Sequence, residues 1–284
     1  MTSTEHPTGA EDAVEIALEA AQADGGGAVG RVVRTGERGG ALLDRRVLVP
    51  ACDPCGECDV CRRGGAAVCP RATRRALSGG LVTAAARWLV PLDDGLALAS
   101  PEAAAVAGDV TTAYTLYART GIAPREPVVV IGANPIGRFL IEILIAKGST
   151  PAALAAGEPW AEWLRTRGVA AGADHAELSA ALAERDLGTR PWRMICADPG
   201  SIAIAAALAG PRATLTALAG AGATPLPGEL VAREVLVIGV AGPHPDLIVE
   251  AAALCVRGDI DLRAGTSRAP DPLRTHVCTP GSPG

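Results

Sequence analysis

The stretch Pro127-Val-Val-Val-Ile-Gly132-Ala-Asn134-Pro-Ile-Gly137 decides the fold class of this 284-residue chain. It begins with a short continuous apolar run, as expected of a buried strand in a parallel sheet. A glycine turn follows at once, and later apolar residues fall on one helical face: Ile136, Phe139, Leu140, Ile143 and Leu144. A strand, a glycine turn and a helix in this order build a dinucleotide-binding crevice. We therefore predict an α/β fold with a doubly wound parallel sheet.

One position of this segment differs from the G-x-G-x-x-G fingerprint, and a second departure from the dinucleotide-binding pattern follows the next expected strand. The middle glycine, which lets the backbone approach the phosphates, is replaced by Asn134. The carboxylate that normally holds the ribose hydroxyl would fall at Ala156, and Glu158 comes two residues later. Pro151 also interrupts the second expected strand. We expect NAD or NADP to bind weakly, with contacts from Gly132, Asn134, Pro135, Ile136, Gly137 and Glu158. A crevice that binds no nucleotide is the other interpretation.

Five of the eight cysteines are crowded into eighteen residues: Cys52, Cys55, Cys58, Cys61 and Cys69. Thiolates two residues apart can face one centre, and four of them satisfy tetrahedral zinc without histidine. The spacing Cys55-x2-Cys58-x2-Cys61-x7-Cys69 predicts one structural zinc per chain, with Cys52 as a spare thiol.

Two other interpretations of the cysteines stay open. The run from Cys52 to Cys58, followed by Cys69-Pro70, is similar to a ferredoxin-type cluster motif, although its last cysteine should follow after about three residues. A disulfide framework would need an oxidising compartment. The N-terminal residues show no signal-peptide pattern, which favours a reducing, cytoplasmic location.

Composition and charge limit the classes of partner that the chain can bind. The formal charge of −5 and the pI near 5.5 leave no basic face for nucleic acid. No apolar run approaches the length that spans a membrane. At 284 residues, 49% of them hydrophobic, the chain is long enough for two domains.

Residues 46–64 read Arg-Val-Leu-Val-Pro-Ala-Cys-Asp-Pro-Cys-Gly-Glu-Cys-Asp-Val-Cys-Arg-Arg-Gly. They resemble the strand and the "PCGxCxxCxxG" lobe of zinc-type medium-chain dehydrogenases/reductases. Residues 121–137 are similar to that family's "GLxPGDxVxVxGAGPIG", and residues 110–114 to the segment that meets the nicotinamide, which implies a cofactor contact at Thr112. The resemblance covers most of residues 12–264. Within the family it is closest to the 6-hydroxycyclohex-1-ene-1-carbonyl-CoA dehydrogenase branch.

The resemblance implies a reduced GroES-like β domain over residues 12–105, with its zinc lobe at 50–72, and a Rossmann domain over residues 106–264. Residues 1–11 are expected to be disordered, and residues 265–284 to form a flexible tail. The implied function is a zinc-binding, NAD(P)-linked oxidoreductase of alcohols or their carbonyl products.

The same family places a second, catalytic zinc on a cysteine in a "GxCxxD" loop, a histidine in "GHE" and a third ligand before the nicotinamide segment. That zinc acts as a Lewis acid on the substrate oxygen. Here the cysteine-bearing loop is missing. Gly26 stands at the histidine, Gly27 at the neighbouring glutamate and Gly108 at the third ligand, with Asp109 one residue out of register. The catalytic residues therefore stay unassigned.

The remaining histidines and cysteines offer no obvious replacement. The histidines are scattered and are interpreted as surface residues: His6, His175, His244 and His276. Cys196 and Cys255 are expected to be core thiols, and Cys278 to lie in the tail.

Three hypotheses follow. The chain is a zinc-independent NAD(P) reductase, a catalytically silent dehydrogenase homologue, or a scaffold subunit with a vestigial crevice. In each case we expect a homodimer through the edge of the Rossmann sheet, where Val235–Val240 offers an apolar strand. The alternative is that residues 265–284 fold over this edge.

Overall fold

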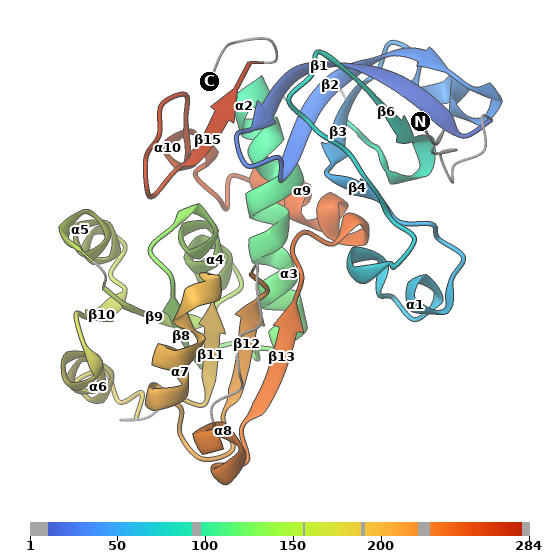
Figure 1. The fold of residues 1–284 in the computed structure, drawn as a ribbon. Coiled ribbons are helices and arrows are strands. Elements are labelled where there is room, and N and C mark those ends of the chain that lie inside the picture. Colours follow the sequence, from blue (N-terminus) through green and yellow to red (C-terminus); the bar gives the residue numbers. More distant parts are fainter. Residues whose placement is uncertain (1–10, 93–97, 156, 189–190, 221–227, 280–284) are drawn as a thin grey trace. The chain divides into compact units, whose positions relative to one another are not determined.

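The computed structural model describes residues 11–92, 98–155, 157–188, 191–220 and 228–279. The chain divides into two units (Figure 1), one formed by Met1–Thr111 with Pro243–Gly284 and the other by Thr112–Gly242. Ala156 and His6 lie outside the described residues. Among the described helices, none is long and apolar enough to cross a membrane.

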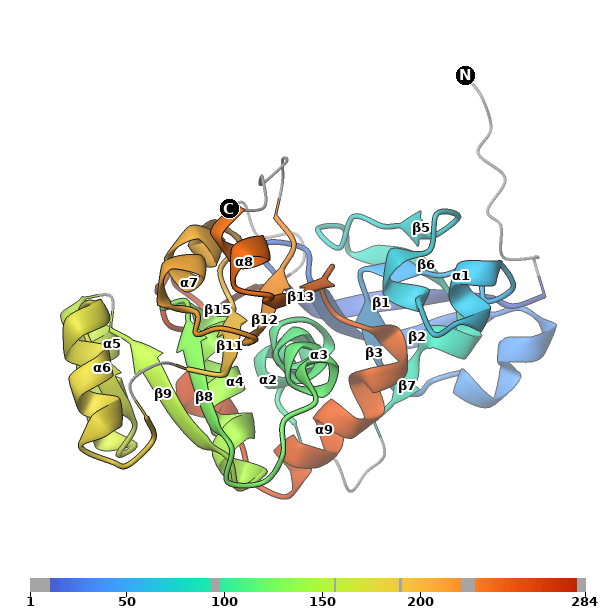
Figure 2. The same cartoon turned by 90° about the horizontal axis from the view of Figure 1, so that it is seen from below.

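The second unit is built on a six-stranded sheet in which all pairings are parallel, in the order β10-β9-β8-β11-β12-β13. Its strands are β8 (Pro127–Ile131), β9 (Thr150–Leu154), β10 (Ala170–Gly172), β11 (Arg193–Cys196), β12 (Thr214–Leu218) and β13 (Leu236–Val240). Its helices are α3 (Thr111–Thr120), α4 (Pro135–Ala146), α5 (Glu158–Thr166), α6 (His175–Ala183), α7 (Ile202–Leu208) and α8 (Gly228–Ala232), with the 3-10 turn η5 (Pro199–Ser201). Figure 2 shows α5 and α6 at the β9–β10 end of this sheet. The strand order reverses after β8, as the doubly wound prediction requires.

Burial explains why the first strand–turn–helix segment forms as predicted. Residues 128–131 of β8 are at most 2% exposed, and the apolar face of α4, including Phe139 and Leu144, is fully buried. Pro151 is tolerated in β9 because it pairs with Val128 of β8, whereas the pairing of β9 with β10 begins one residue later. Proline has no backbone N–H, but at this position no hydrogen bond between β9 and β10 is lost.

The first unit contains a mostly antiparallel sheet in the order β14-β15-β1-β2-β3-β7, with β6 also paired to β1. Its strands are β1 (Ala13–Gln22), β2 (Gly27–Thr35), β3 (Arg46–Pro50), β6 (Leu81–Ala85), β7 (Val90–Pro91), β14 (Thr266–Ser267) and β15 (Thr275–Cys278). A separate ribbon pairs β4 (Cys52–Asp53) with β5 (Thr73–Arg74). The helical elements are η1 (Glu37–Leu42), α1 (Asp59–Arg62), η2 (Ala66–Val68), η3 (Ala86–Trp88), α2 (Ser100–Ala105), the π-helical turn η4 (Val106–Val110), η6 (Pro245–Leu247), α9 (Ile248–Val256) and α10 (Leu262–Gly265).

The prediction of a flexible tail over residues 265–284 is wrong for residues 266–278. Strand β15 pairs antiparallel with β1, placing Ala21 opposite Cys278 and Gln22 opposite Val277. Thr275 and Val277 are 2% and 3% exposed, so the alternating pattern of a half-buried strand is present in only four residues. The domain boundary also differs from residue 264, because the chain from Pro243 onward belongs to the first unit.

A buried carboxylate joins this C-terminal strand to the helical turn. Thr275 Oγ1 donates a hydrogen bond of 2.6 Å to Asp109 Oδ2, and Asp109 is 8% exposed. Burial raises the pKa of Asp109 to about 6, although the hydrogen bond from Thr275 acts in the opposite direction. The folded state therefore binds the Asp109 proton more tightly than the unfolded chain does.

This proton linkage predicts a pH-dependent stability. The contribution of Asp109 is fully present below the unfolded pKa of about 3.9 and is lost as the pH rises through the folded-state pKa of about 6. Asp109→Asn keeps an acceptor for Thr275 and removes the buried charge. We expect the variant to exceed the wild type in unfolding free energy by up to about 3 kcal/mol above pH 7, with the difference vanishing near pH 4. Urea unfolding at several pH values measures this difference, with the exposed Asp259→Asn as control. A constant difference across this pH range would contradict the linkage.

Candidate functional site

The four cysteines of the predicted zinc lobe converge. The Sγ atoms of Cys55, Cys58, Cys61 and Cys69 all lie within 4.8 Å of one another. Three of the separations are 4.0 Å for Cys55–Cys61, 3.8 Å for Cys58–Cys69 and 3.6 Å for Cys55–Cys69. Sulfurs bound at about 2.3 Å to a tetrahedral zinc are about 3.8 Å apart. The donor set and its spacing therefore fit a four-coordinate structural zinc, and Cys52 stands outside the cluster.

Backbone N–H groups prepare two of these thiols for a metal. The backbone N–H of Glu57 lowers the pKa of Cys55 to about 6, and the N–H of Cys61 lowers that of Cys58. Burial acts the other way on Cys61 and raises its pKa to about 12. A bound cation would supply the charge that lets all four ligands ionise together.

The lobe is tied to the rest of its unit from three sides. At its base, Asp53 accepts a hydrogen bond of 2.8 Å from the backbone N–H of Ala85 and forms a buried ion pair with Arg75. Trp88 Nε1 donates to the carbonyl of Pro54 at 2.8 Å. His244 Nε2 lies 2.9 Å from the carbonyl oxygen of Gly64, at the end of the lobe. His244 is therefore a structural contact and not the surface residue that the sequence suggested.

The positions expected to hold a catalytic zinc are filled by another side chain. A Cβ atom built on Gly26 would lie 2.6 Å from Gln22 Oε1, and one built on Gly108 would overlap that same oxygen. Gln22 is 3% exposed. Its amide thus occupies the space into which ligands at positions 26 and 108 would project. The residues present do not fit a metal ion at this place.

Asp109 does not restore a ligand set there, because its carboxylate is engaged by Thr275 in the buried contact described above. Gly27 is equally constrained. A Cβ at that position would lie 2.5 Å from the backbone of Ala107 and Gly108, so no larger residue is accommodated. Positions 26, 27 and 108 therefore have no room for larger side chains in the first unit.

The nucleotide turn of the second unit is capped by its own side chain. Asn134 Oδ1 accepts a hydrogen bond of 2.8 Å from the N–H of Gly137, and Asn134 Nδ2 donates at 3.0 Å to the carbonyl of Ala197. The N–H of Gly137 belongs to the helix start where a pyrophosphate would bind. Asn134 has φ −147°, an extended conformation open to any residue, so no left-handed backbone is involved.

The two outer glycines of the turn are required by packing. Gly132 has φ +133°, and its Cβ would lie 2.9 Å from the backbone nitrogen of Asp198. A Cβ on Gly137 would overlap the carbonyl oxygen of Gly132. The structure thus brings Gly132, Asn134 and Gly137 together, and Pro135 and Ile136 form the first turn of α4.

The other predicted cofactor contacts are less well placed. Glu158 opens α5 with its side chain 83% exposed, 3.7 Å from Arg165. Thr112 is a buried residue of α3. The expected carboxylate position, Ala156, lies outside the described residues.

Sequence reasoning did not bring together one pair of side chains that the structure places in contact. Cys278 and His276 alternate along β15 and their Sγ and Nε2 atoms are 3.8 Å apart. The period-2 alternation of Thr275-His-Val-Cys was the available signal, but four residues after a Pro-rich segment are too few to predict a strand. Cys196 and Cys255 are both buried, as predicted. His175 is exposed at the start of α6.

Solved structures share this fold. The alcohol dehydrogenase TADH from Thermus sp. ATN1 matches with a TM-score of 0.78 and 18% sequence identity over 94% of this chain and 86% of that chain. A short chain alcohol dehydrogenase from E. coli CFT073, complexed with NADH, matches at 0.76 and 18% over 91% and 84%. A putative zinc-binding dehydrogenase from Sinorhizobium meliloti 1021, bound to NADP, matches at 0.74 and 17% over 93% and 86%. The fold is therefore a GroES-like domain joined to a Rossmann domain. No protein-family model and no curated protein sequence matches the chain.

The cysteine cluster predicts one zinc per chain. Replacing Cys58 removes one of four ligands, so Cys58→Ser is expected to lose the zinc and to lower the melting temperature by at least about 4 °C. Cys52→Ser is the matched control and should keep both the zinc and the melting temperature of the wild type. Elemental analysis and calorimetry of the two variants provide the measurement. Two zinc ions per chain, or an iron–sulfur absorption band, would contradict this assignment.

Proposed function

We propose that the protein is a zinc-binding, NAD(P)-linked member of the alcohol dehydrogenase fold whose zinc is structural and whose catalytic zinc site is lost. The observation that carries the proposal is the Gln22 amide, which fills the space between Gly26 and Gly108. The cysteine lobe supports the structural half, since its four sulfurs have the spacing that zinc requires. Zinc there would order the lobe and supply no Lewis acid to a substrate.

The geometry of the nucleotide turn supports weak binding of NAD or NADP. The helix start still directs backbone N–H groups outward, but the N–H of Gly137 is already satisfied by Asn134. A phosphate must displace this hydrogen bond, which costs on the order of 1 kcal/mol, about one decade in affinity. If a nicotinamide is bound, it supplies hydride, and any substrate carbonyl would be activated by hydrogen bonds of the protein alone.

A catalytically silent homologue, acting as a binding or scaffold subunit, is the second candidate. Two features that oppose nucleotide binding favour this candidate. Asn134 caps the turn, and Glu158 is exposed and paired with Arg165. Reductase assays with NADH and NADPH over a panel of aldehydes and ketones separate the two candidates. Turnover by the zinc-loaded chain supports the first, and its absence in the presence of bound nucleotide supports the second.

We also propose a homodimer that pairs the β13 edges of two copies. Strand β13 is the last of its sheet, and Leu236 on it is 58% exposed. Residues 275–278, which belong to the alternative cover, form β15 and pair with β1 in the first unit. An exposed apolar edge strand is a template for pairing with a second chain.

The capped turn predicts how nucleotide affinity responds to substitution. Asn134→Gly frees the N–H of Gly137, so NADH is expected to bind about tenfold more tightly, at a cost of a few tenths of a kcal/mol in helix capping. Asn134→Asp keeps the cap and adds a negative charge, and should weaken binding. Calorimetric titration with NADH and NADPH measures both. Micromolar affinity of the wild-type chain for NADH, unchanged in Asn134→Gly, would show that the cap does not limit binding.

The edge pairing predicts a shift in oligomeric state. Leu236→Lys places a charge on the exposed edge and leaves Val237, which packs against the core, in place. We expect sedimentation at micromolar concentration to show a dimer for the wild type and a monomer for this variant. Val231→Lys, at a position 70% exposed on α8, is the control and should stay dimeric. A monomeric wild-type chain would refute the proposal.

A further inference from the structure

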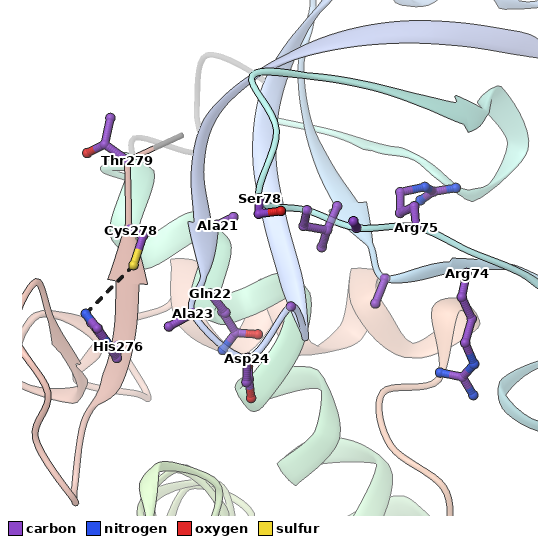
Figure 3. A pocket seen from close by; sticks show the side chains of 14 residues that line it. Ala21, Gln22, Ala23, Asp24, Arg74, Arg75, Ser78, His276, Cys278 and Thr279 are labelled. Carbon is purple, nitrogen blue, oxygen red and sulfur yellow. Dashed lines mark hydrogen bonds between the residues drawn. The ribbon is translucent and has the colours of Figure 1, made fainter. Parts of the chain in front are cut away.

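A cavity of about 550 Å³ lies in the first unit, away from the cysteine cluster. Four parts of the chain form it: the end of β1 with the turn at 23–25, Ala51 between β3 and β4, the segment 74–78 that begins at the end of β5, and the residues 276, 278 and 279 in and after β15 (Figure 3). Much of its wall is apolar, from Ala21, Ala23, Ala51, Ala76 and Leu77. Its volume suits a small organic molecule.

A thiol and an imidazole share one wall of this cavity. Cys278 Sγ lies 3.8 Å from His276 Nε2 (Figure 3), within the reach of a hydrogen bond to sulfur. The pairing of Cys278 with Ala21 and a hydrogen bond of 2.9 Å from the Ala23 N–H to the His276 carbonyl fix both residues on the strand. Both side chains are half-buried, so the pair is sheltered and still accessible.

The imidazole of His276 is placed to act as a base toward the Cys278 thiol. An imidazole that takes the thiol proton leaves a thiolate beside an imidazolium, which is the nucleophilic form of cysteine. Arg74 and Arg75 also line the cavity, opposed by Asp24, and Arg75 is already paired with Asp53. Arg74 therefore contributes a positive charge to the wall of the cavity.

Gln22 also lines the cavity and is 3% exposed, and its amide oxygen lies between positions 26 and 108. Its amide atoms are buried beside the Asp109 carboxylate, so they form part of the wall and offer no contact to a ligand. The reactive groups of the cavity are therefore those of β15.

We propose that Cys278 and His276 form a nucleophilic thiol site that captures α,β-unsaturated carbonyl compounds in this cavity. The Cys278 sulfur forms a bond to the β carbon, and the π electron pair of the C=C bond moves to the carbonyl as an enolate. The proton taken up by His276 then passes to the α carbon. The product is a saturated thioether, and no oxidant or reductant is consumed. The apolar wall would hold the alkyl chain of the ligand. This site is independent of nicotinamide binding.

The zinc-loaded full-length protein provides the test, because zinc protects the four cluster thiols from alkylation. The protein is incubated with trans-2-hexenal, and peptide mapping follows adducts on Cys278 and on Cys52, the other half-buried thiol outside the cluster. Burial raises the pKa of Cys52, which makes it a suitable internal reference. We expect Cys278 to react at least about tenfold faster than Cys52.

Two variants sharpen the result. Cys278→Ser should abolish the fast adduct, and His276→Gln should slow it about tenfold while leaving the slow reaction of Cys52 unchanged. The comparison of the two thiols in the wild-type chain needs no variant and holds even if one of them fails to fold. Equal reaction of Cys278 and Cys52, or a wild-type rate in a folded His276→Gln chain, would overturn the proposal.

Discussion

The close approach of the Gly26–Gly27 backbone to the π-helical turn at Ala107–Gly108 is the constraint on which the first unit depends. Side chains at these positions would collide with backbone or with Gln22, so the amide of Gln22 is the group that fits the space. The same turn presents Asp109 to Thr275, which holds the C-terminal strand beside β1. One steric requirement thus selects glycine at these positions, and the same turn holds the buried Asp109 and anchors strand β15.

Much of the fold was predictable because its determinants are local. The apolar run 127–131, the turn after it and the helical period of α4 lie within twenty residues, and they fixed the parallel sheet. The cysteine cluster was equally local, since ligands two residues apart converge by spacing alone. The C-terminal strand was not predictable in this way. Its partner, β1, lies more than 250 residues earlier in the sequence, and four alternating residues carry too little signal.

The candidate site also has features that the sequence predicts and features that only the structure shows. The sequence predicted that ligands are missing at positions 26 and 108, but it could not show that Gln22 fills the space, because that contact joins the turn at 22–26 to the distant position 108. The substitution at Asn134 was visible, whereas its consequence was not. An asparagine at the helix start can intrude on a phosphate or cap the helix, and the hydrogen bond to the N–H of Gly137 shows that it caps. The Cys278–His276 pair required the strand to be known first.

The glycine positions of the two units show which residues the packing of the fold requires and which residues a ligand would require. Gly132 and Gly137 are present at positions where a Cβ would meet backbone atoms, so the fold itself requires them. The middle position of the turn has an extended backbone that accepts any residue, and there the glycine that a pyrophosphate would require is absent. The same holds in the first unit, where glycines fit the backbone contact and ligand side chains are missing. The cavity of this unit is lined by His276 and Cys278 on β15, beside the end of β1 that carries Gln22. The glycines are therefore explained by steric contacts of the fold, whereas the lining of the cavity depends on the pairing of β15 with β1.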